Sequence, residues 1–307
     1  MSLPLLDKAT SDKLKHRAAV ASISLAILLS GLKLFATIAS GSLAVFSSMI
    51  DSVSDVLGSA ITFIAIKYST RPATDHHRYG YGKAEAISAL IQAFFVAGSG
   101  LFVLYDAFLR FFHPRVLDET PLAIAIMVFS LVATLVLIAY QKYVAKLTQS
   151  QAIDADSAHY VVDILTNSSI ILSLTVVKFF EIYWFDTLTA LVIAIYLLYN
   201  AYQLVVEAFD VLLDRELSDD IRQNINNIIS RHEFVKGFHD VRTHSLGNEY
   251  MIEIHLELDG RLSLYEAHQL SDQVETAIIK EYPNAQVIIH QDPSGVSEDR
   301  LDAKLKR

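Results

Sequence analysis

Cysteine is absent from this chain of 307 residues. The absence excludes disulfide bonds and cysteine-based zinc fingers, and it removes the thiolate ligands that favour Cu(I). An excess of basic residues is missing as well, because the formal net charge is −9. Since a nucleic-acid-binding surface is basic, we exclude nucleic acid as a partner.

Long apolar runs fill the first two thirds of the chain, and none follows residue 210. A helix rises about 1.5 Å per residue, so roughly 20 apolar residues span the hydrocarbon core of a bilayer. Six runs reach that length, at about 18–39, 43–66, 86–112, 121–141, 153–178 and 182–209. The sequence therefore predicts a domain of six transmembrane helices over residues 1–210 and a soluble domain over 211–307.

Basic residues in the short loops indicate the orientation of the helices. If the N-terminus is cytoplasmic, ten basic residues lie on that side and three on the other. The ten are Lys8, Lys13, Lys15, Arg17, Lys67, Arg71, Arg78, Lys83, Lys142 and Lys146, and the three are Arg110, Arg115 and Lys178. Both termini, and with them residues 211–307, are therefore expected in the cytoplasm, with membrane lipid around the helices.

Ionisable residues interrupt the second and the fifth apolar run. Asp51 and Asp55 lie in one run and His159 and Asp163 in the other. Each pair is spaced i, i+4 and therefore shares one helix face. One charge at the centre of a bilayer costs roughly 2.5–3.5 kcal/mol on insertion scales, and such residues usually mark a functional site. Three carboxylates and one imidazole from two helices make a four-ligand cation site. A structural polar network is the alternative, but three carboxylates repel one another unless they are protonated or bridged by a cation.

The type of ligand narrows the choice of metal. Oxygen and nitrogen without sulfur suit tetrahedral Zn²⁺. Mg²⁺ and Ca²⁺ prefer six or more oxygens, whereas Cd²⁺, Fe²⁺, Co²⁺ and Mn²⁺ stay open. Metal competes with protons for these ligands, so binding releases protons. The sequence thus favours a divalent metal/proton antiporter. It would be a secondary active transporter and not an enzyme, with metal ions and protons as partners and no organic cofactor.

The polar segment after the second run carries Asp75, His76 and His77. Carboxylate and imidazole groups this close together favour a second metal site near the cytoplasmic surface. A solvated polar loop explains the same residues equally well, so both interpretations stay open.

Residues 211–307 have the pattern of a small α/β domain. Ser218 and the two acidic residues after it predict the start of a helix that ends near Arg231. A strand is expected at 239–246, and a second at 249–258 because apolar and polar residues alternate there.

The second half of this domain adds one helix and one strand. Ser263 and Glu266 form a capping box for a helix that ends near Tyr282, and residues 286–290 form the last strand. The order α-β-β-α-β predicts an open-faced two-layer sandwich.

Potential metal ligands gather in this soluble domain within some 55 residues. A lone histidine is more often a surface residue than a ligand, but a cluster of this density favours a cytoplasmic metal site. The candidates are His239, His255, His268, His290 and Asp292. A metal site in this domain would serve metal sensing or dimer stabilisation, because the soluble domain offers no route through the membrane.

Several strings of residues resemble one known family. They are DSVSD in the second run, HYVVD in the fifth, GKAE before the third, LLDR at the membrane exit, and HLELDG and VIIHQDP in the soluble domain. The chain resembles the cation diffusion facilitators, and within them the YiiP branch of bacterial zinc and ferrous-iron efflux proteins. The resemblance implies a homodimer in the bacterial inner membrane that exchanges cytoplasmic Zn²⁺ for protons.

The resemblance also implies roles for individual residues. The transport site would be Asp51, Asp55, His159 and Asp163, and the soluble domain would hold a binuclear site on His239, His255, His268, His290 and Asp292, with Gln291 nearby. Lys83 and Asp214 would form a charge pair at the membrane exit.

The loop after the second run departs from the pattern of the family. The family places an Asp, a His three residues later and a second His four residues beyond that. Those positions hold Thr74, His77 and Tyr81 here. A loop site would therefore depend on His77 with Asp75 or His76.

Two other classes of protein compete with the transporter. A membrane-anchored metal sensor would use the soluble domain but would leave three acidic residues at membrane depth unexplained. An intramembrane aspartyl protease needs one Asp from each of two helices and a GxGD-type turn, whereas Asp51 and Asp55 share a helix and no such turn occurs.

Overall fold

The computed structural model describes residues 7–40, 43–112, 121–180, 184–247, 249–296 and 300–305. The chain divides into two compact units, Thr10–Phe209 and a unit built chiefly from Asp210–Arg307.

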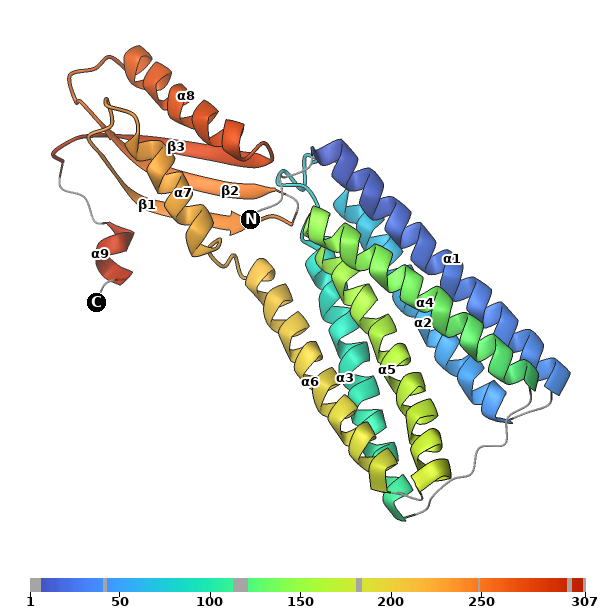
Figure 1. Ribbon diagram of the computed structural model, residues 1–307. Coiled ribbons are helices and arrows are strands. Elements are labelled where there is room, and N and C mark those ends of the chain that lie inside the picture. The colour runs from blue at the N-terminus through green and yellow to red at the C-terminus, as the bar shows by residue number, and fades with distance from the viewer. Residues whose placement is uncertain are drawn as a thin grey trace. The chain divides into compact units, whose positions relative to one another are not determined.

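Among the described residues, the first unit consists of six helices (Figure 1). They are α1 (Lys8–Ser40), α2 (Leu43–Ser69), α3 (Ala84–Phe112), α4 (Pro121–Thr148), α5 (Gln151–Phe180) and α6 (Trp184–Leu212). The predicted six-helix fold is confirmed. Within the described residues, four stretches are long and apolar enough to cross a membrane: Lys8–Phe35, Ala84–Tyr105, Val128–Thr148 and Leu188–Leu212.

Helix α5 is central to the packing of this unit, because it contacts α2, α3 and α4. Small residues line its contact with α3 and α6, among them Ala89, Ala93 and Ala155, which are all buried. Small side chains let helix backbones approach closely in a membrane, where apolar burial itself gives little driving force. Large apolar residues such as Phe94 and Phe102 are instead exposed, as lipid-facing positions require.

The second unit is a three-stranded sheet with helices. Its elements are α7 (Asp219–Ser230), β1 (Gly237–Ser245), β2 (Tyr250–Leu258), α8 (Leu264–Glu281), β3 (Ala285–Pro293) and α9 (Leu301–Leu305). The strand order is β1-β2-β3, with β1 and β2 antiparallel and β2 and β3 parallel. A parallel pair needs a long crossover, and α8 supplies it (Figure 1). The predicted order α-β-β-α-β is confirmed, and α9 is an addition that the sequence pattern did not predict.

The core of this unit lies between one face of the sheet and helices α7 and α8. Ile252, Ile254 and Leu256 of β2 point into it, together with Ile229 of α7 and Ile278 of α8. Alternate residues of a strand point to opposite faces, so the odd-numbered residues of β2 lie on the face away from these helices.

The two predicted helix starts differ in detail. Ser263 accepts a bond from the backbone N–H of Glu266, and the Glu266 side chain accepts from Ser263, so the capping box is confirmed. Ser218 is the N-cap of α7, but its side chain makes no capping hydrogen bond. The acidic first turn of α7, Asp219 and Asp220, still complements the helix dipole.

Candidate metal centres

The membrane unit brings one acidic residue of α2 against the histidine of α5. Asp55 Oδ1 lies 3.2 Å from His159 Nε2, and both side chains are buried. Asp163 follows one turn later on α5 and is partly buried. Asp51 lies one turn before Asp55 on α2, and its side chain is outside the described part of the structure. The contact therefore joins two residues that are 104 positions apart in the sequence.

The separation of these two atoms fits a shared metal. Zinc binds imidazole nitrogen and carboxylate oxygen at roughly 2.0–2.1 Å, so two ligand atoms of one tetrahedral zinc lie about 3.3 Å apart. Asp55 Oδ1 and His159 Nε2 already stand at nearly that spacing. A buried carboxylate beside a buried imidazole is also stable without metal when the imidazole carries a proton. The same two atoms can therefore accept either a metal ion or a proton.

A second buried carboxylate, Asp156, lies one turn before His159 on α5. Its Oδ2 accepts hydrogen bonds from Ser22 Oγ and Gln141 Nε2, each at 2.5 Å, and its Oδ1 accepts a weaker one from Gln92 Nε2 at 3.3 Å. These donors belong to α1, α4 and α3, so Asp156 ties α5 to three neighbouring helices. In the sequence Asp156 is only one more polar residue, three positions before His159, because its partners lie up to 134 residues away.

A buried ion pair at the ends of the helices was missed by sequence reasoning. Lys15 Nζ of α1 donates to Glu85 Oε1 of α3 at 2.8 Å, and both side chains are almost fully buried. Ser69 and Ser150 donate to the same carboxylate at 3.0 and 2.5 Å. Glu85 thus holds α1, the end of α2 and the segment before α5 together. The only sequence signal for it is its place in the GKAE string.

The loop between α2 and α3 presents its histidines to solvent. His77 and Asp75 are both exposed. The His77 ring lies 4.5 Å from the Tyr81 ring, and Thr74 Oγ1 is 3.2 Å from the Tyr81 hydroxyl. A shallow hollow beside them is lined by Ala73, Thr74, Asp75 and Arg78. These contacts involve aromatic and hydroxyl groups, and a metal site on Asp75 and His77 stays a prediction.

Strand register aligns three histidines across the sheet of the second unit. His239 of β1 pairs with His255 of β2, which pairs in turn with His290 of β3. All three lie on the face away from α7 and α8. Asp292 lies two residues beyond His290 on β3 and therefore points to the same face.

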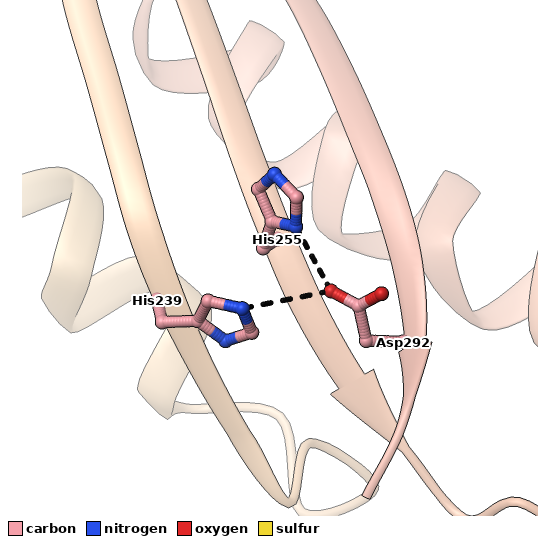
Figure 2. Close-up of side chains that lie close together, drawn as sticks. All are labelled: His239, His255 and Asp292. Carbon is pink, nitrogen blue, oxygen red and sulfur yellow. Dashed lines mark hydrogen bonds and ion pairs between the residues drawn. The ribbon is translucent and has the colours of Figure 1, made fainter. Parts of the chain in front are cut away.

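Three of these residues form the one group in the described part of the chain whose ligand atoms lie within 4.8 Å of one another: His239, His255 and Asp292. Figure 2 shows both imidazoles turned towards the carboxylate. Asp292 Oδ2 is 2.9 Å from His255 Nδ1 and 3.7 Å from His239 Nε2. Two imidazoles and one carboxylate are a donor set that suits zinc.

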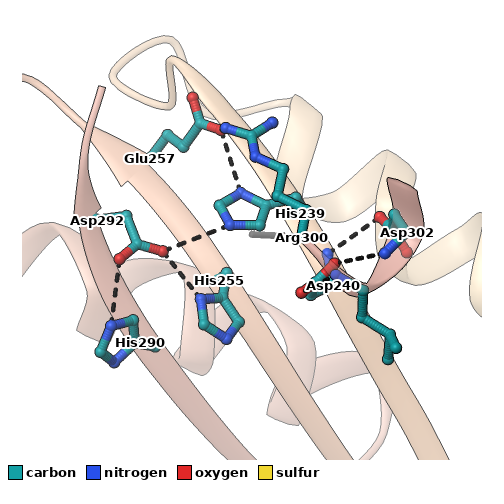
Figure 3. Close-up of polar contacts among 9 residues, drawn as sticks. His239, Asp240, His255, Glu257, His290, Asp292, Arg300 and Asp302 are labelled. Carbon is teal, nitrogen blue, oxygen red and sulfur yellow. Dashed lines mark hydrogen bonds and ion pairs between the residues drawn. The ribbon is translucent and has the colours of Figure 1, made fainter. Parts of the chain in front are cut away.

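The other predicted ligands of this domain lie at the margin of the group. His290 Nε2 is 3.2 Å from Asp292 Oδ1, the second oxygen of the same carboxylate, and its side chain is exposed (Figure 3). His268 is exposed on α8, where its Nδ1 lies 3.4 Å from Asp272 Oδ1. Gln291 pairs with Leu256, whose side chain points into the core. One copy of the chain therefore groups three of the five predicted ligands, with His290 adjacent and His268 apart.

The two residues of the predicted charge pair, Lys83 and Asp214, belong to different units. Asp214 Oδ1 lies 3.6 Å from His244 Nε2 of β1. Lys83 lies directly before α3 in the other unit. Their pairing stays a prediction.

The fold and the sites together define a membrane transporter for metal cations with a cytoplasmic metal-binding domain. The model of the cation efflux transmembrane domain matches residues 19–213, and that of the cation efflux protein cytoplasmic domain, a dimerisation domain, matches residues 217–294. The chain belongs to the cation efflux family, the cation diffusion facilitators.

Curated relatives extend over nearly the whole chain. The cation-efflux pump FieF of Escherichia fergusonii is 39% identical over 284 residues, which are 92% of this chain and 94% of the relative. The FieF pump of Serratia proteamaculans has the same identity and coverage. Among solved structures, the metal-bound C-terminal domain of the CzcD transporter from Thermotoga maritima is 31% identical, covering 26% of this chain and 93% of its own, with a TM-score of 0.25.

Proposed function

We propose that this protein exports Zn²⁺ from the cytoplasm in exchange for protons. The buried contact between Asp55 and His159 carries the proposal, because it places a carboxylate and an imidazole from two helices at the spacing of zinc ligands. The relatives known as cation-efflux pumps support the direction of transport.

The transport site is assigned to Asp51, Asp55, His159 and Asp163. The i, i+4 spacing of each pair places Asp51 and Asp163 one turn from the contact, within reach of the same ion. Four ligands without sulfur accept Zn²⁺, and Cd²⁺ and Fe²⁺ fit the same set. The single imidazole favours zinc over harder ions such as Mn²⁺, so His159→Asp should lower the ratio of Zn²⁺ to Mn²⁺ transport.

Proton coupling follows from the chemistry of these ligands. Imidazole titrates near neutral pH, and it cannot hold a proton and a metal ion on the same nitrogen. Metal arriving from the cytoplasm therefore displaces protons, and protons arriving from the other side displace metal. An inward proton gradient then drives metal outward.

The cytoplasmic unit is assigned a resident metal centre shared by a homodimer. Asp292 would bridge two ions, one held with His239 and His255 and the other with His290. His268 lies apart from the group in one copy, so it would act as a ligand only by reaching a site on a second copy. Facing acidic domains repel one another, and cations between them would make the dimer depend on metal.

The topology completes the proposal. Residues 1–210 form the transport domain and 211–307 the cytoplasmic domain. The protein spans a bacterial inner membrane with both termini on the cytoplasmic side, an orientation that the excess of basic residues in the loops supports.

Metal transport by reconstituted variants tests the assignment. Proteoliposomes with an acidic lumen and a zinc-sensitive dye should fill with zinc when they carry the parent protein. Asp51→Ala, Asp55→Ala or Asp163→Ala should each abolish uptake, because a four-ligand site has no spare ligand.

Asp154→Asn is the matched control, since Asp154 is an exposed carboxylate on α5 that pairs with Lys142 at 2.8 Å. The control should transport as the parent does. Near-normal transport by any of the three site variants would refute the four-ligand site. A parent protein that binds zinc without transporting it would be a sensor.

A further inference from the structure

Residues 300–305 lie beyond residue 294, where the match to the family model ends, and they pack against β1, the strand that carries His239. Arg300 Nη2 donates to Glu257 Oε1 at 2.6 Å, and helix α9 contacts β1. Figure 3 shows Arg300 and Asp302 meeting the strands beside His239. The segment therefore reaches the residues that surround a proposed ligand.

The first connection runs through Glu257 to the ring of His239. Glu257 Oε1 accepts from His239 Nδ1 at 3.1 Å, which leaves Nε2 turned towards Asp292. A carboxylate that binds the second nitrogen of a ligating histidine sets the tautomer and the orientation of the ring. Arg300 donates to the same oxygen, so Glu257 Oε1 connects Arg300 to the His239 ring. Gly237 leaves it room, because a Cβ at that position would lie 2.9 Å from Glu257 Oε2.

The second connection runs through Asp240, the residue after His239. The register of β1 and β2 shifts between His239 and Arg242, and Asp240 adopts a φ of +47° in this bulge. A non-glycine residue in the left-handed region needs support from its surroundings. The bulge directly follows His239 and therefore affects the position of this proposed ligand. Contacts that stabilise the Asp240 backbone also stabilise that position.

Asp240 and the start of α9 exchange hydrogen bonds that supply this support. The Asp240 carboxylate accepts from the backbone N–H groups of Leu301 and Asp302 at 2.8 and 2.9 Å. The Asp302 carboxylate accepts in return from the backbone N–H of Asp240 at 3.1 Å. Asp240 is buried, so its carboxylate and its backbone N–H depend on residues 301 and 302 for their hydrogen bonds.

We infer that residues 300–302 form a clasp that positions His239 for metal through Glu257 and the Asp240 bulge. The inference rests on the proposed metal centre of the cytoplasmic unit. Coupling of this kind is reciprocal: the closed clasp raises the affinity for metal, and bound metal keeps the clasp closed. Arg300 and Asp302 are positioning residues and touch no metal themselves.

Zinc titration of the full-length protein in detergent tests the clasp. All variants carry Asp55→Asn as a common background, which weakens zinc binding at the transport site. Calorimetry then measures zinc binding at the cytoplasmic centre. Arg300→Gln and Asp302→Asn should each weaken zinc binding roughly 10–100-fold, the range for partners of metal ligands. Gly237→Ala should act in the same direction by displacing Glu257. Arg300→Lys keeps the charge beside Glu257 and should restore most of the affinity.

The control is Arg261→Gln, because Arg261 is exposed and pairs with Asp259 away from the metal group. Its zinc affinity should equal that of the background. Amide exchange is the second readout: zinc should slow exchange at Asp240, Leu301 and Asp302 in the background protein but not in Asp302→Asn.

The possible failures are distinguishable. Parent-like zinc affinity in Arg300→Gln and Asp302→Asn would overturn the clasp and leave the metal centre in place. A background protein whose cytoplasmic unit takes up no zinc would overturn the metal centre itself and the positioning role with it.

Discussion

Asp292→Asn should remove most of the zinc-dependent stability of the cytoplasmic unit. One buried carboxylate lies within 3.7 Å of His239 and His255 through Oδ2 and within 3.2 Å of His290 through Oδ1. Asparagine preserves the shape of the side chain. It lacks the negative charge, and one oxygen becomes an amide group that cannot bind metal.

The expected magnitude follows from mass action. Zinc that binds only the folded unit adds about 2.7 kcal/mol to the free energy of unfolding when free zinc is about 100 times its dissociation constant. Mutation of a residue that only hydrogen-bonds to a metal ligand lowers metal affinity up to about 100-fold. Asp292 is itself a proposed ligand, so we take a roughly 100-fold loss of zinc affinity as the minimum for its replacement. The same zinc then adds only about 0.4 kcal/mol, so the variant loses about 2.3 kcal/mol.

Amide exchange of β2 in the full-length protein measures this loss. At that zinc concentration, exchange through opening of the unit should slow about 100-fold in the parent and about twofold in Asp292→Asn. Asp259→Asn is the control, because Asp259 binds Arg261 outside the metal group and its variant should respond to zinc as the parent does. Equal slowing by zinc in the parent and in Asp292→Asn would refute the role of this carboxylate.

Three further predictions concern parts of the structure outside the metal group. Lys15→Met alone should lower the free energy of unfolding by about 3–5 kcal/mol, since it leaves Glu85 buried and unpaired, and adding Glu85→Gln should recover part of it in thermal scans. Asp156→Ala should cost about 1–3 kcal/mol for each buried donor left unpaired, again read from thermal unfolding. The Ser263 hydroxyl and backbone N–H lower the pKa of Glu266, so the capping box stabilises α8 at neutral pH and is lost as the pH falls through that pKa. Exchange in the first turn of α8 should show this loss in the parent and not in Glu266→Gln.

Local patterns were sufficient to predict the five elements from α7 to β3 of the cytoplasmic unit, but not α9. The alternation from Tyr250 to Leu258 places Ile252 and Ile254 in the core as expected, and the box at Ser263 starts α8. Helix α1 begins at Lys8, ten residues before the predicted apolar run. The first turns of α1 are polar, so a search for apolar runs does not find them. Lys15 in these turns is buried because it pairs with Glu85, and hydropathy does not reveal such a pair.

The candidate sites were predictable where spacing along one element determines the geometry. The i, i+4 spacing indicated the pairs Asp51–Asp55 and His159–Asp163, and the structure brings Asp55 of the first pair against His159 of the second. Other contacts between residues far apart in the sequence were missed. Asp156 receives bonds from three other helices, and the clasp joins Asp240 to Asp302 across 62 residues. Such contacts depend on tertiary packing and leave no periodic signal.

Simultaneous measurement of zinc and proton flux in proteoliposomes tests the central claim most directly. The parent protein should move zinc into an acidic lumen while protons leave in fixed proportion, and collapse of the proton gradient should stop net zinc accumulation. Asp55→Asn should abolish both fluxes, because the buried Asp55–His159 contact is the proposed meeting point of metal and proton. Zinc accumulation that is indifferent to the proton gradient, or that persists in Asp55→Asn, would contradict the account.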